Sequence, residues 1–504
     1  MRSTRSPGVY QAIEERKLVP VSLGPTGVAG FVGVAQRGPT NLPVRITSMA
    51  EFRAIYGEME EEGYLAPAIE GFFSNGGEVA YMLRVAHLVR RGREDIAKPG
   101  LIKLKDSTGK ETIRMQAANA GVWGNSVRVA VQRQEPRVST FLTLDLKAGD
   151  TSAVIKSSLG IRRGTVVRIT DGKKAAYRTV IELSGKTIAW SANEPLEEDF
   201  KSGAPTFIET VEFTVQTKWK QQTETFKNLS MSPLSELYFE RVLNTQSALV
   251  SVTDQRVESS LEERFPVDVA ETFLTGGTDG LYTVTPEDFI GANIGPEERY
   301  GIAAFEAVEE VDILICPDVM WALNKSAGFR TEKDVEVVQA AMVSQCERLK
   351  TRVCILDFPD PADHRRAGQW RLLFDSPYAA FYFPWLVAES VSGDVRTVPP
   401  SGHVAGLYAR CDRLQGPYRA PANETLEGVL DLARPLTETD IGSLTGQSIN
   451  CIKPFPRRGI RVWGARTTSN DPQWRHINVR RVVNTIISSV ERGLQWAVFE
   501  SNSH

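Results

Sequence analysis

Three side chains between residues 398 and 413 are of the types that a serine hydrolase uses. Ser401 could serve as the nucleophile, His403 as the general base and Asp412 as the carboxylate that orients the base. A nucleophile elbow needs glycine at both positions two residues from the serine, and this sequence has Pro399 and His403 there. We therefore expect Ser401 and His403 to belong to a turn or an interface, and we predict no catalytic residue and no enzyme activity.

Two glycine-containing segments could bind calcium or phosphate. Residues 276–280 lack the alternating acidic ligands of a calcium loop. Gly185 precedes Lys186 and Thr187 as in a P-loop, but Val180 stands where the first glycine of that motif is required. Turns account better for both segments, so we predict that the protein has no cofactor.

The five histidines and five cysteines do not follow a metal-binding pattern. The sequence contains no HxxxH and no CxxC spacing. His364 has carboxylates nearby in DPADHRR, but loops often have this composition. Cys316 and Cys354 lie in short apolar runs and are expected to be buried, reduced side chains. We therefore predict no metal site.

The length and charge of the chain are those of a multidomain globular protein. A chain of 504 residues is expected to form two to three domains. The net charge of −3 argues against nucleic acid as a partner. Separate basic and acidic clusters are typical of solvated faces, and the alternative is charge-complementary contact between copies of the chain. The longest apolar run, residues 377–388, is too short to span a bilayer, and the N-terminus lacks a hydrophobic signal core. We expect no insertion into a membrane.

Strand and helix patterns alternate at both ends of the chain. Near the N-terminus the patterns predict strands at 28–34 and 79–85 and helices at 48–56 and 64–73. After residue 280 they predict strands at 311–316 and 352–358, a helix at 332–349 and an aromatic buried segment at 377–385. The segment from about 101 to 274 is rich in β patterns, with hairpin signals at 171–172 and 184–185.

The simplest fold class is an α/β core, a mixed sheet flanked by helices, that the N- and C-terminal segments assemble together. A β-rich domain is inserted between them, as surface junctions tolerate. We expect an N-terminal extended arm at 1–20, the first core segment at 21–95, the inserted outer domain at 96–275 with a sub-insert at about 146–207, and the second core segment with a C-terminal helix and tail at 276–504.

The C-terminal segment 474–494 has the strongest helical pattern in the chain. Its apolar residues recur every three or four positions and form one stripe, namely Val479, Val483, Ile486, Ile487, Val490 and Leu494. An extended tail is expected to follow at 496–499.

Apolar residues at both chain ends suggest extended arms. Loose strands of this kind are unstable alone and pair with the edge of a sheet. If the sheet belongs to a neighbouring copy, the contact is heterologous and propagates into rings or helical lattices. The candidate intersubunit residues are Pro7, Gly8, Val9, Tyr10 and Ile13 at the N-terminus and Leu494, Trp496, Val498 and Phe499 at the C-terminus.

Several motifs resemble the contractile tail sheath proteins of bacteriophages and related injection particles. They include SPGVY at 6–10, AGVWGNSVRV at 120–129, FLTGGTDG at 273–280, SPYAAFYFPW at 376–385, VPPSGHVAGLYARCD at 398–412 and WRHINVRR at 474–481. The motifs cover both ends of the chain, and the middle around 146–207 matches in general character only.

The resemblance implies a structural subunit that polymerises as stacked hexameric rings around an inner tube and contracts to drive the tube through a target envelope. It implies further copies, an inner tube protein and baseplate and terminator proteins as partners, and production in the bacterial cytoplasm before assembly into a tail or contractile particle. It also implies that the C-terminal helix faces the tube with Asn478, Arg480, Arg481 and Asn484. The alternative is a non-contracting or truncated sheath-related component of baseplate or terminator type.

Overall fold

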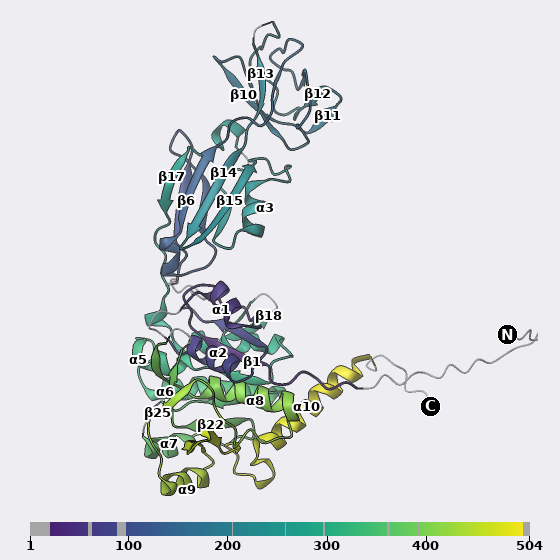
Figure 1. Ribbon diagram of the computed structural model, residues 1–504. Coiled ribbons are helices and arrows are strands. Elements are labelled where there is room, and N and C mark those ends of the chain that lie inside the picture. The colour runs from purple at the N-terminus through teal and green to yellow at the C-terminus, as the bar shows by residue number, and fades with distance from the viewer. Residues whose placement is uncertain are drawn as a thin grey trace, which may run out of the picture.

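The protein has three regions arranged one above another: an α/β body, a β-rich middle region and a smaller β-rich tip (Figure 1). The computed structural model describes residues 21–58, 63–87, 97–203, 205–257, 259–295, 298–359, 363–390 and 393–496. Both ends of the described chain lie on the body.

An eight-stranded sheet in the order β2-β3-β1-β20-β21-β22-β26-β27 forms the centre of the body. Its strands are β1 (Ala29–Gly33), β2 (Val44–Ile46), β3 (Ala80–Arg84), β20 (Ile313–Ile315), β21 (Val353–Leu356), β22 (Ala379–Phe383), β26 (Asn450–Phe455) and β27 (Gly459–Trp463). The strands from β3 to β26 run parallel, and an antiparallel strand closes each edge. Segments from both ends of the chain therefore pair in one sheet.

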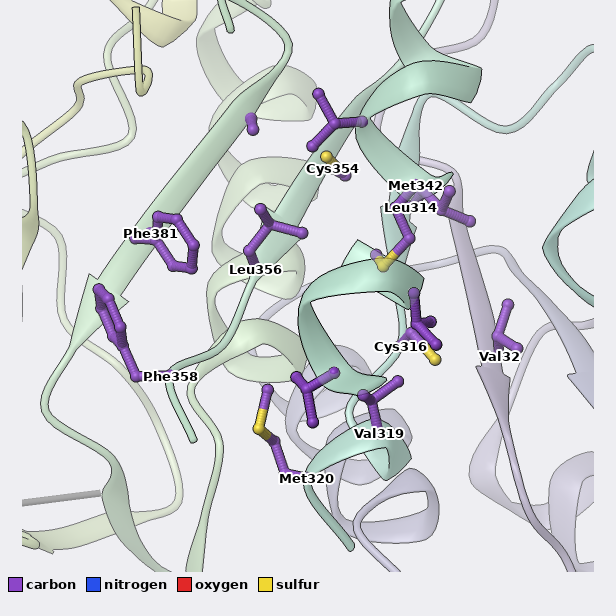
Figure 2. Close-up of a cluster of buried hydrophobic side chains, with 14 of the residues drawn as sticks. Val32, Leu314, Cys316, Val319, Met320, Met342, Cys354, Leu356, Phe358 and Phe381 are labelled. Carbon is purple, nitrogen blue, oxygen red and sulfur yellow. The ribbon is translucent and has the colours of Figure 1, made fainter. Parts of the chain in front are cut away.

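Helices cover both faces of this sheet. One face carries α1 (Met49–Tyr56), α2 (Leu65–Ser74) and α8 (Ser401–Gln415), and the other carries α5 (Asp318–Lys325), α6 (Glu332–Leu349), α7 (His364–Arg371) and α9 (Glu438–Gly446). Successive strand residues point to opposite faces, so Ile313 and Ile315 pack with the first set and Leu314 with the second. Figure 2 shows Leu314, Leu356 and Phe381 in the hydrophobic cluster on the face that carries α5, α6, α7 and α9.

The predicted mixed sheet with flanking helices is confirmed, as are the predicted core elements. Ser48 caps α1, because its hydroxyl accepts from the backbone N–H of Glu51 at 3.2 Å. The helix predicted at 332–349 is α6, and the strand predicted at 352–358 contains β21. The helix predicted at 474–494 is α10, which begins three residues later and spans Ile477–Leu494.

The middle region consists of two sheets, β15-β14-β6-β17 and β16-β5-β4, around a core of their own. Its elements are β4 (Leu101–Lys105), β5 (Glu111–Ala117), β6 (Arg128–Arg133), β14 (Phe213–Trp219), β15 (Gln222–Leu229), α3 (Phe239–Gln246), β16 (Val250–Asp254) and β17 (Val269–Phe273).

The tip has a separate small core between the sheets β10-β9-β13-β7 and β11-β12-β8. Its strands are β7 (Ser139–Phe141), β8 (Ser152–Val154), β9 (Val166–Thr170), β10 (Ala175–Thr179), β11 (Glu182–Ser184), β12 (Thr187–Ala189) and β13 (Phe207–Thr210). Both predicted hairpins are confirmed, because β9 pairs with β10 and β11 pairs with β12. Lys186 therefore lies in a hairpin turn.

Shorter elements complete the body. They are α4 (Pro286–Ile290), the hairpin β18 (Ala292–Gly295) and β19 (Glu298–Tyr300), and a small sheet of β23 (Leu386–Glu389), β24 (Val395–Val398) and β25 (Val429–Leu432). Within the residues described, no helix combines the length and apolarity needed to cross a bilayer. All five cysteines are free and buried, as expected for Cys316 and Cys354.

Two arginines of the body fasten it to the middle region. The fully buried Arg84 donates to the backbone carbonyls of residues 35, 38 and 120, so that one guanidinium joins the two regions. The Arg37 guanidinium lies over the ring of Trp219, 4.3 Å from its centroid, and 5.8 Å from that of Trp123. Residues 276–280 form the return crossing, where Asn125 exchanges two hydrogen bonds with the backbone of Gly277.

Candidate functional site

The three residues that could have formed a hydrolytic triad lie apart on α8. Ser401 and His403 are two residues apart on a helix and so point in different directions. Asp412 lies eleven residues after Ser401, a rise of about 16 Å along the helix axis. The expectation of a turn at 401–403 was wrong, because these residues form the first turn of a buried helix; sequence reading missed it since Pro399 and Pro400 directly precede the helix.

Ser401 has a structural partner from the sheet. Its hydroxyl donates to Asp357 Oδ2 at 2.6 Å, and its backbone N–H donates to Asp357 Oδ1 at 3.2 Å. Burial raises the pKa of Asp357 to about 7, and the two hydrogen bonds from Ser401 oppose this rise. Asp357 thus caps α8 from the end of β21 and holds the serine hydroxyl away from His403.

His403 lies in a tight apolar contact. A Cβ on Gly71 would lie 2.4 Å from His403 Nδ1, so the imidazole edge rests directly on the backbone of α2. Burial lowers the pKa of His403 to about 4, which keeps the ring neutral at physiological pH. The histidine therefore acts as a packing residue between α2 and α8.

The C-terminal helix α10 buries its polar face and exposes four residues of its apolar stripe, while Val483 and Ile487 are half-buried. Ile477, Arg480, Arg481, Asn484, Thr485 and Ser489 are buried. Val479 is 41% exposed, Ile486 54%, Val490 41% and Leu494 46%. This orientation is the reverse of the usual arrangement of a surface helix, in which the apolar stripe faces the core.

Arg481 is the reason for this orientation. Its guanidinium makes a two-pronged contact with Asp412 of α8, at 2.7 and 2.5 Å, and also donates to Asp312 Oδ2 at 2.9 Å. Asp312 in turn accepts from the backbone N–H groups of Gly27, at 3.1 Å, and Val28, at 2.7 Å. One arginine therefore joins the last helix, α8, the start of β20 and the N-terminal segment.

One guanidinium faces two carboxyl groups in this cluster. Burial acts to lower the pKa of Arg481, but the charges of Asp412 and Asp312 outweigh it and raise the pKa above its ordinary value. Burial raises the pKa of Asp312, and the charge of Arg481 opposes the rise. The side chains of Arg481 and Asp412 are 3% and 1% exposed, so neither charge has water as an alternative partner.

Neighbouring residues on the same face of α10 also bind the body. The Arg480 guanidinium lies over the rings of Trp474 and Tyr378, with centroid distances of 4.2 and 4.6 Å, and its Nε donates to Asn484 Oδ1 at 2.9 Å. Thr485 and Ser489 satisfy their hydroxyls by donating to helix carbonyls four residues earlier. Each of these side chains therefore makes at least one polar or cation–π contact, while the buried Asn484 Nδ2 has no hydrogen-bond partner among the described residues.

The N-terminal segment runs along this face. The backbone N–H of Gly24 donates to Ser489 Oγ at 2.9 Å. A Cβ on Gly493 would meet Val21 at 2.9 Å, so the first described residues lie against the last turn of α10. Gly27, with φ of +76°, lets this segment approach α8, since a Cβ there would lie 2.8 Å from the Cα of Ala409. The described chain therefore begins and ends side by side.

The predicted tube-facing residues have a different environment from the one expected. Arg480, Arg481 and Asn484 are buried against the body of their own chain, so they cannot offer side chains to a tube. Asn478 donates to the carbonyl of Tyr418 at 2.9 Å. The sequence did not indicate that Asp412 and Asp312 hold this polar face against the body; that the helix faces a tube stays a prediction.

Of the candidate arm residues, the structure describes only Leu494 and Trp496, which lie near the C-terminus. Leu494 ends α10, and Trp496, 57% exposed, is the last residue described. Pro7, Gly8, Val9, Tyr10, Ile13, Val498 and Phe499 lie outside the described residues.

Sequence reading missed the carboxylates that organise the site. Asp312 directly precedes the buried strand β20, and Asp357 directly follows β21. A charged residue directly adjoining an apolar strand is the signal that could have identified them.

In the portion of the chain described, no three His, Cys, Asp or Glu side chains gather as metal ligands would. His364 Nε2 lies 3.6 Å from Asp440 Oδ1.

Comparison with known proteins identifies the class. Residues 292–468 match the family model of the phage tail sheath protein central domain. A prophage major tail sheath protein of Pseudomonas aeruginosa is 27% identical over 174 residues, 32% of this chain and 43% of that protein. The tail sheath protein of Burkholderia phage BcepMu is 32% identical over 230 residues, 41% of this chain and 45% of that protein. The chain thus spans less than half the length of either relative.

The fold agrees with this assignment. The solved sheath tail protein of Listeria innocua is 11% identical, with a TM-score of 0.54 over 95% of this chain and 78% of that chain. A likeness at this identity concerns the fold alone. Residues 292–468 are thus similar to the central domain of phage tail sheath proteins. By these matches the chain resembles the tail sheath proteins.

We predict that removing Arg481 strongly destabilises the body. Arg481→Met leaves Asp412 and Asp312 buried without a counter-charge, which costs about 3–5 kcal/mol of unfolding free energy. Arg348→Met is the control, because Arg348 is 55% exposed in its ion pair with Glu306 and its loss costs less than about 1 kcal/mol. Urea unfolding followed by tryptophan fluorescence measures both. Equal losses in the two variants would contradict the prediction.

We also predict a pH signature for Asp357. Its folded pKa of about 7 exceeds its ordinary value of 3.8, so the folded state holds the proton more tightly than the unfolded state does. The contribution of this group to stability is therefore fully present below about pH 4 and lost as the pH rises to about 7. Asp357→Asn lacks this titration. Its melting temperature relative to the wild type should rise between pH 4 and pH 8, and a constant difference would show that Asp357 titrates normally.

Proposed function

We propose that this chain is the subunit of a contractile sheath, which polymerises as stacked rings around an inner tube and contracts to drive the tube through a target envelope. The observation that carries the proposal beyond this family resemblance is the orientation of α10. An exposed apolar stripe on a helix whose polar face is fixed by ion pairs is a surface for protein contact. In this proposal the stripe packs against another protein of the assembly.

The position of the chain ends supports a linking role. Val21 lies against Gly493, so the first described residues adjoin the last turn of α10. Residues 7–13 and 494–499 are the proposed arms, each pairing with a neighbouring copy. We retain the division at residues 20, 95 and 275, with the middle region and tip as the outer domain.

The proposed partners are further copies in six-membered rings, an inner tube protein, a baseplate and a terminator protein. Shifting a two-state ring from 1:99 to 99:1 takes roughly 5.5 kcal/mol, which is about 1 kcal/mol for each of six subunits. Charge pairs at subunit surfaces have energies of this order. The energy of contraction can therefore be stored in the lattice.

Deletion of residues 1–13 should abolish tube formation and leave a folded monomer. The contacts that fasten the N-terminal segment to α10 and α8 begin at residues 21–27, outside the deletion. Electron microscopy with the inner tube protein reads out assembly, and circular dichroism reads out folding. Wild-type protein should form helical tubes of two widths. Tubes formed by the deletion variant would refute the arm, and a wild type that stays monomeric would favour the baseplate or terminator alternative.

Charges placed on the stripe should block assembly without unfolding the protein. Ile486→Glu with Val490→Glu puts two carboxylates on a surface that is already exposed, so the melting temperature should change by less than about 3 °C. Tube formation should fall at least tenfold in sedimentation assays. Val337→Glu on α6, 43% exposed, is the matched control and should assemble normally. Normal tubes from the double variant would remove α10 from the interface.

A further inference from the structure

The strand order of the body contains the type of crevice in which α/β sheets bind ligands. From β1 the chain passes through α1 and α2 to β3 on one side, and from β20 it passes through α5 and α6 to β21 on the other. The helices of the two connections lie on opposite faces of the sheet. The carboxyl ends of β1 and β20 therefore form a topological switch point, where ligands of doubly wound sheets bind.

A side chain of the protein occupies this crevice. Asp318, the first residue of α5, is fully buried. Its Oδ2 accepts from the backbone N–H of Val34 at 2.7 Å, immediately beyond β1. Its Oδ1 accepts from the backbone N–H groups of Tyr64 and Leu65, the latter at 3.1 Å, at the start of α2. Three backbone donors thus surround one carboxylate.

The surrounding residues are adapted to this carboxylate. Tyr64 at the N-cap of α2 makes no side-chain capping bond, so the helix receives its cap from Asp318 across the crevice. A Cβ on Gly33 would lie 2.4 Å from Asp318 Oδ2, so only glycine at the end of β1 leaves room for the carboxylate. A glycine, a loop N–H and a helix N-terminus are the elements with which such folds hold a ligand phosphate.

We propose that Asp318 is an internal ligand that closes the anion-binding crevice of a doubly wound sheet. It replaces the phosphate or carboxylate of a small molecule with a covalently attached anion. The two connections, which diverge at the switch point, are thereby tied together without dependence on any metabolite. A mechanical subunit gains a rigid body from this arrangement, and the crevice of the native chain binds no anion.

The charge on Asp318 depends on the pH. Burial raises the pKa of Asp318 to about 6, and the backbone donors of Tyr64, Val34 and Leu65 oppose the rise, as does the charge of Arg396. The carboxyl group is therefore ionised at pH 8, the condition chosen for the test. Asp357 repeats the arrangement at the end of the adjacent strand β21, where it caps α8.

Chemical rescue tests the proposal in the full-length chain. Asp318→Gly leaves three backbone donors around a space the size of an acetate ion. The melting temperature at pH 8 should fall by about 5–10 °C in sodium chloride. Replacement of chloride by acetate at equal ionic strength should raise the melting temperature of this variant in a saturable manner. The wild type should melt at the same temperature in both salts.

Two further variants make the result decisive. Asp363→Gly removes the exposed cap of α7, where water can replace the carboxylate, and should show no acetate-specific rise. Asp318→Asn keeps the shape but offers one acceptor oxygen to three donors, so it should melt several degrees below the wild type and not respond to acetate. Absence of rescue in folded Asp318→Gly overturns the proposal. If that variant does not fold, Asp318→Asn decides, and wild-type stability of Asp318→Asn overturns the proposal.

Discussion

The body of this protein depends on one buried arginine that joins elements far apart in the sequence. Arg481 holds Asp412 of α8 and Asp312 at the start of β20, and Asp312 holds the backbone of Gly27 and Val28. A buried charge of this kind is expensive without partners and stable with them. The last helix and the N-terminal segment are therefore linked to the sheet through buried ion pairs and hydrogen bonds.

The surface that α10 presents follows from this constraint. The ion pairs hold one face of α10 against the body, and this face carries Arg480, Arg481 and Asn484. The hydroxyl groups of Thr485 and Ser489 bond to their own helix, so they are buried at little cost. The apolar stripe is left outside, where it stays unfavourable until another protein covers it. In the proposed assembly, one side of α10 packs within the subunit and the opposite side contacts another protein.

Carboxylates at the carboxyl edge of the sheet serve the same end. Asp318 and Asp357 follow adjacent parallel strands and cap α2 and α8, two helices that pack against each other. In many α/β proteins this edge is open and adaptable, because it receives a ligand. In this chain the carboxyl groups of Asp318 and Asp357 occupy this edge. The side chains that suggested catalysis, Ser401 and His403, pack there as well. The carboxyl edge of this sheet is thus occupied by the protein's own side chains.

The sequence by itself determined the local elements and indicated the family resemblance. Strand and helix patterns placed α1, α6, β21 and both hairpins of the tip, because periodicity and turn residues act within a few positions. Sequence motifs likewise indicated the resemblance to tail sheath proteins.

Only the tertiary structure decided which face of α10 is buried and what Ser401, His403 and Asp412 contact. Those outcomes depend on carboxylates that are distant in the chain: Asp312 lies 169 residues from Arg481, and Asp357 lies 44 residues from Ser401. The pattern of apolar residues in one segment carries no information about a charged side chain on a distant strand. The burial of the polar face of α10 could therefore be recognised only in the tertiary structure, where the sheet brings these groups together.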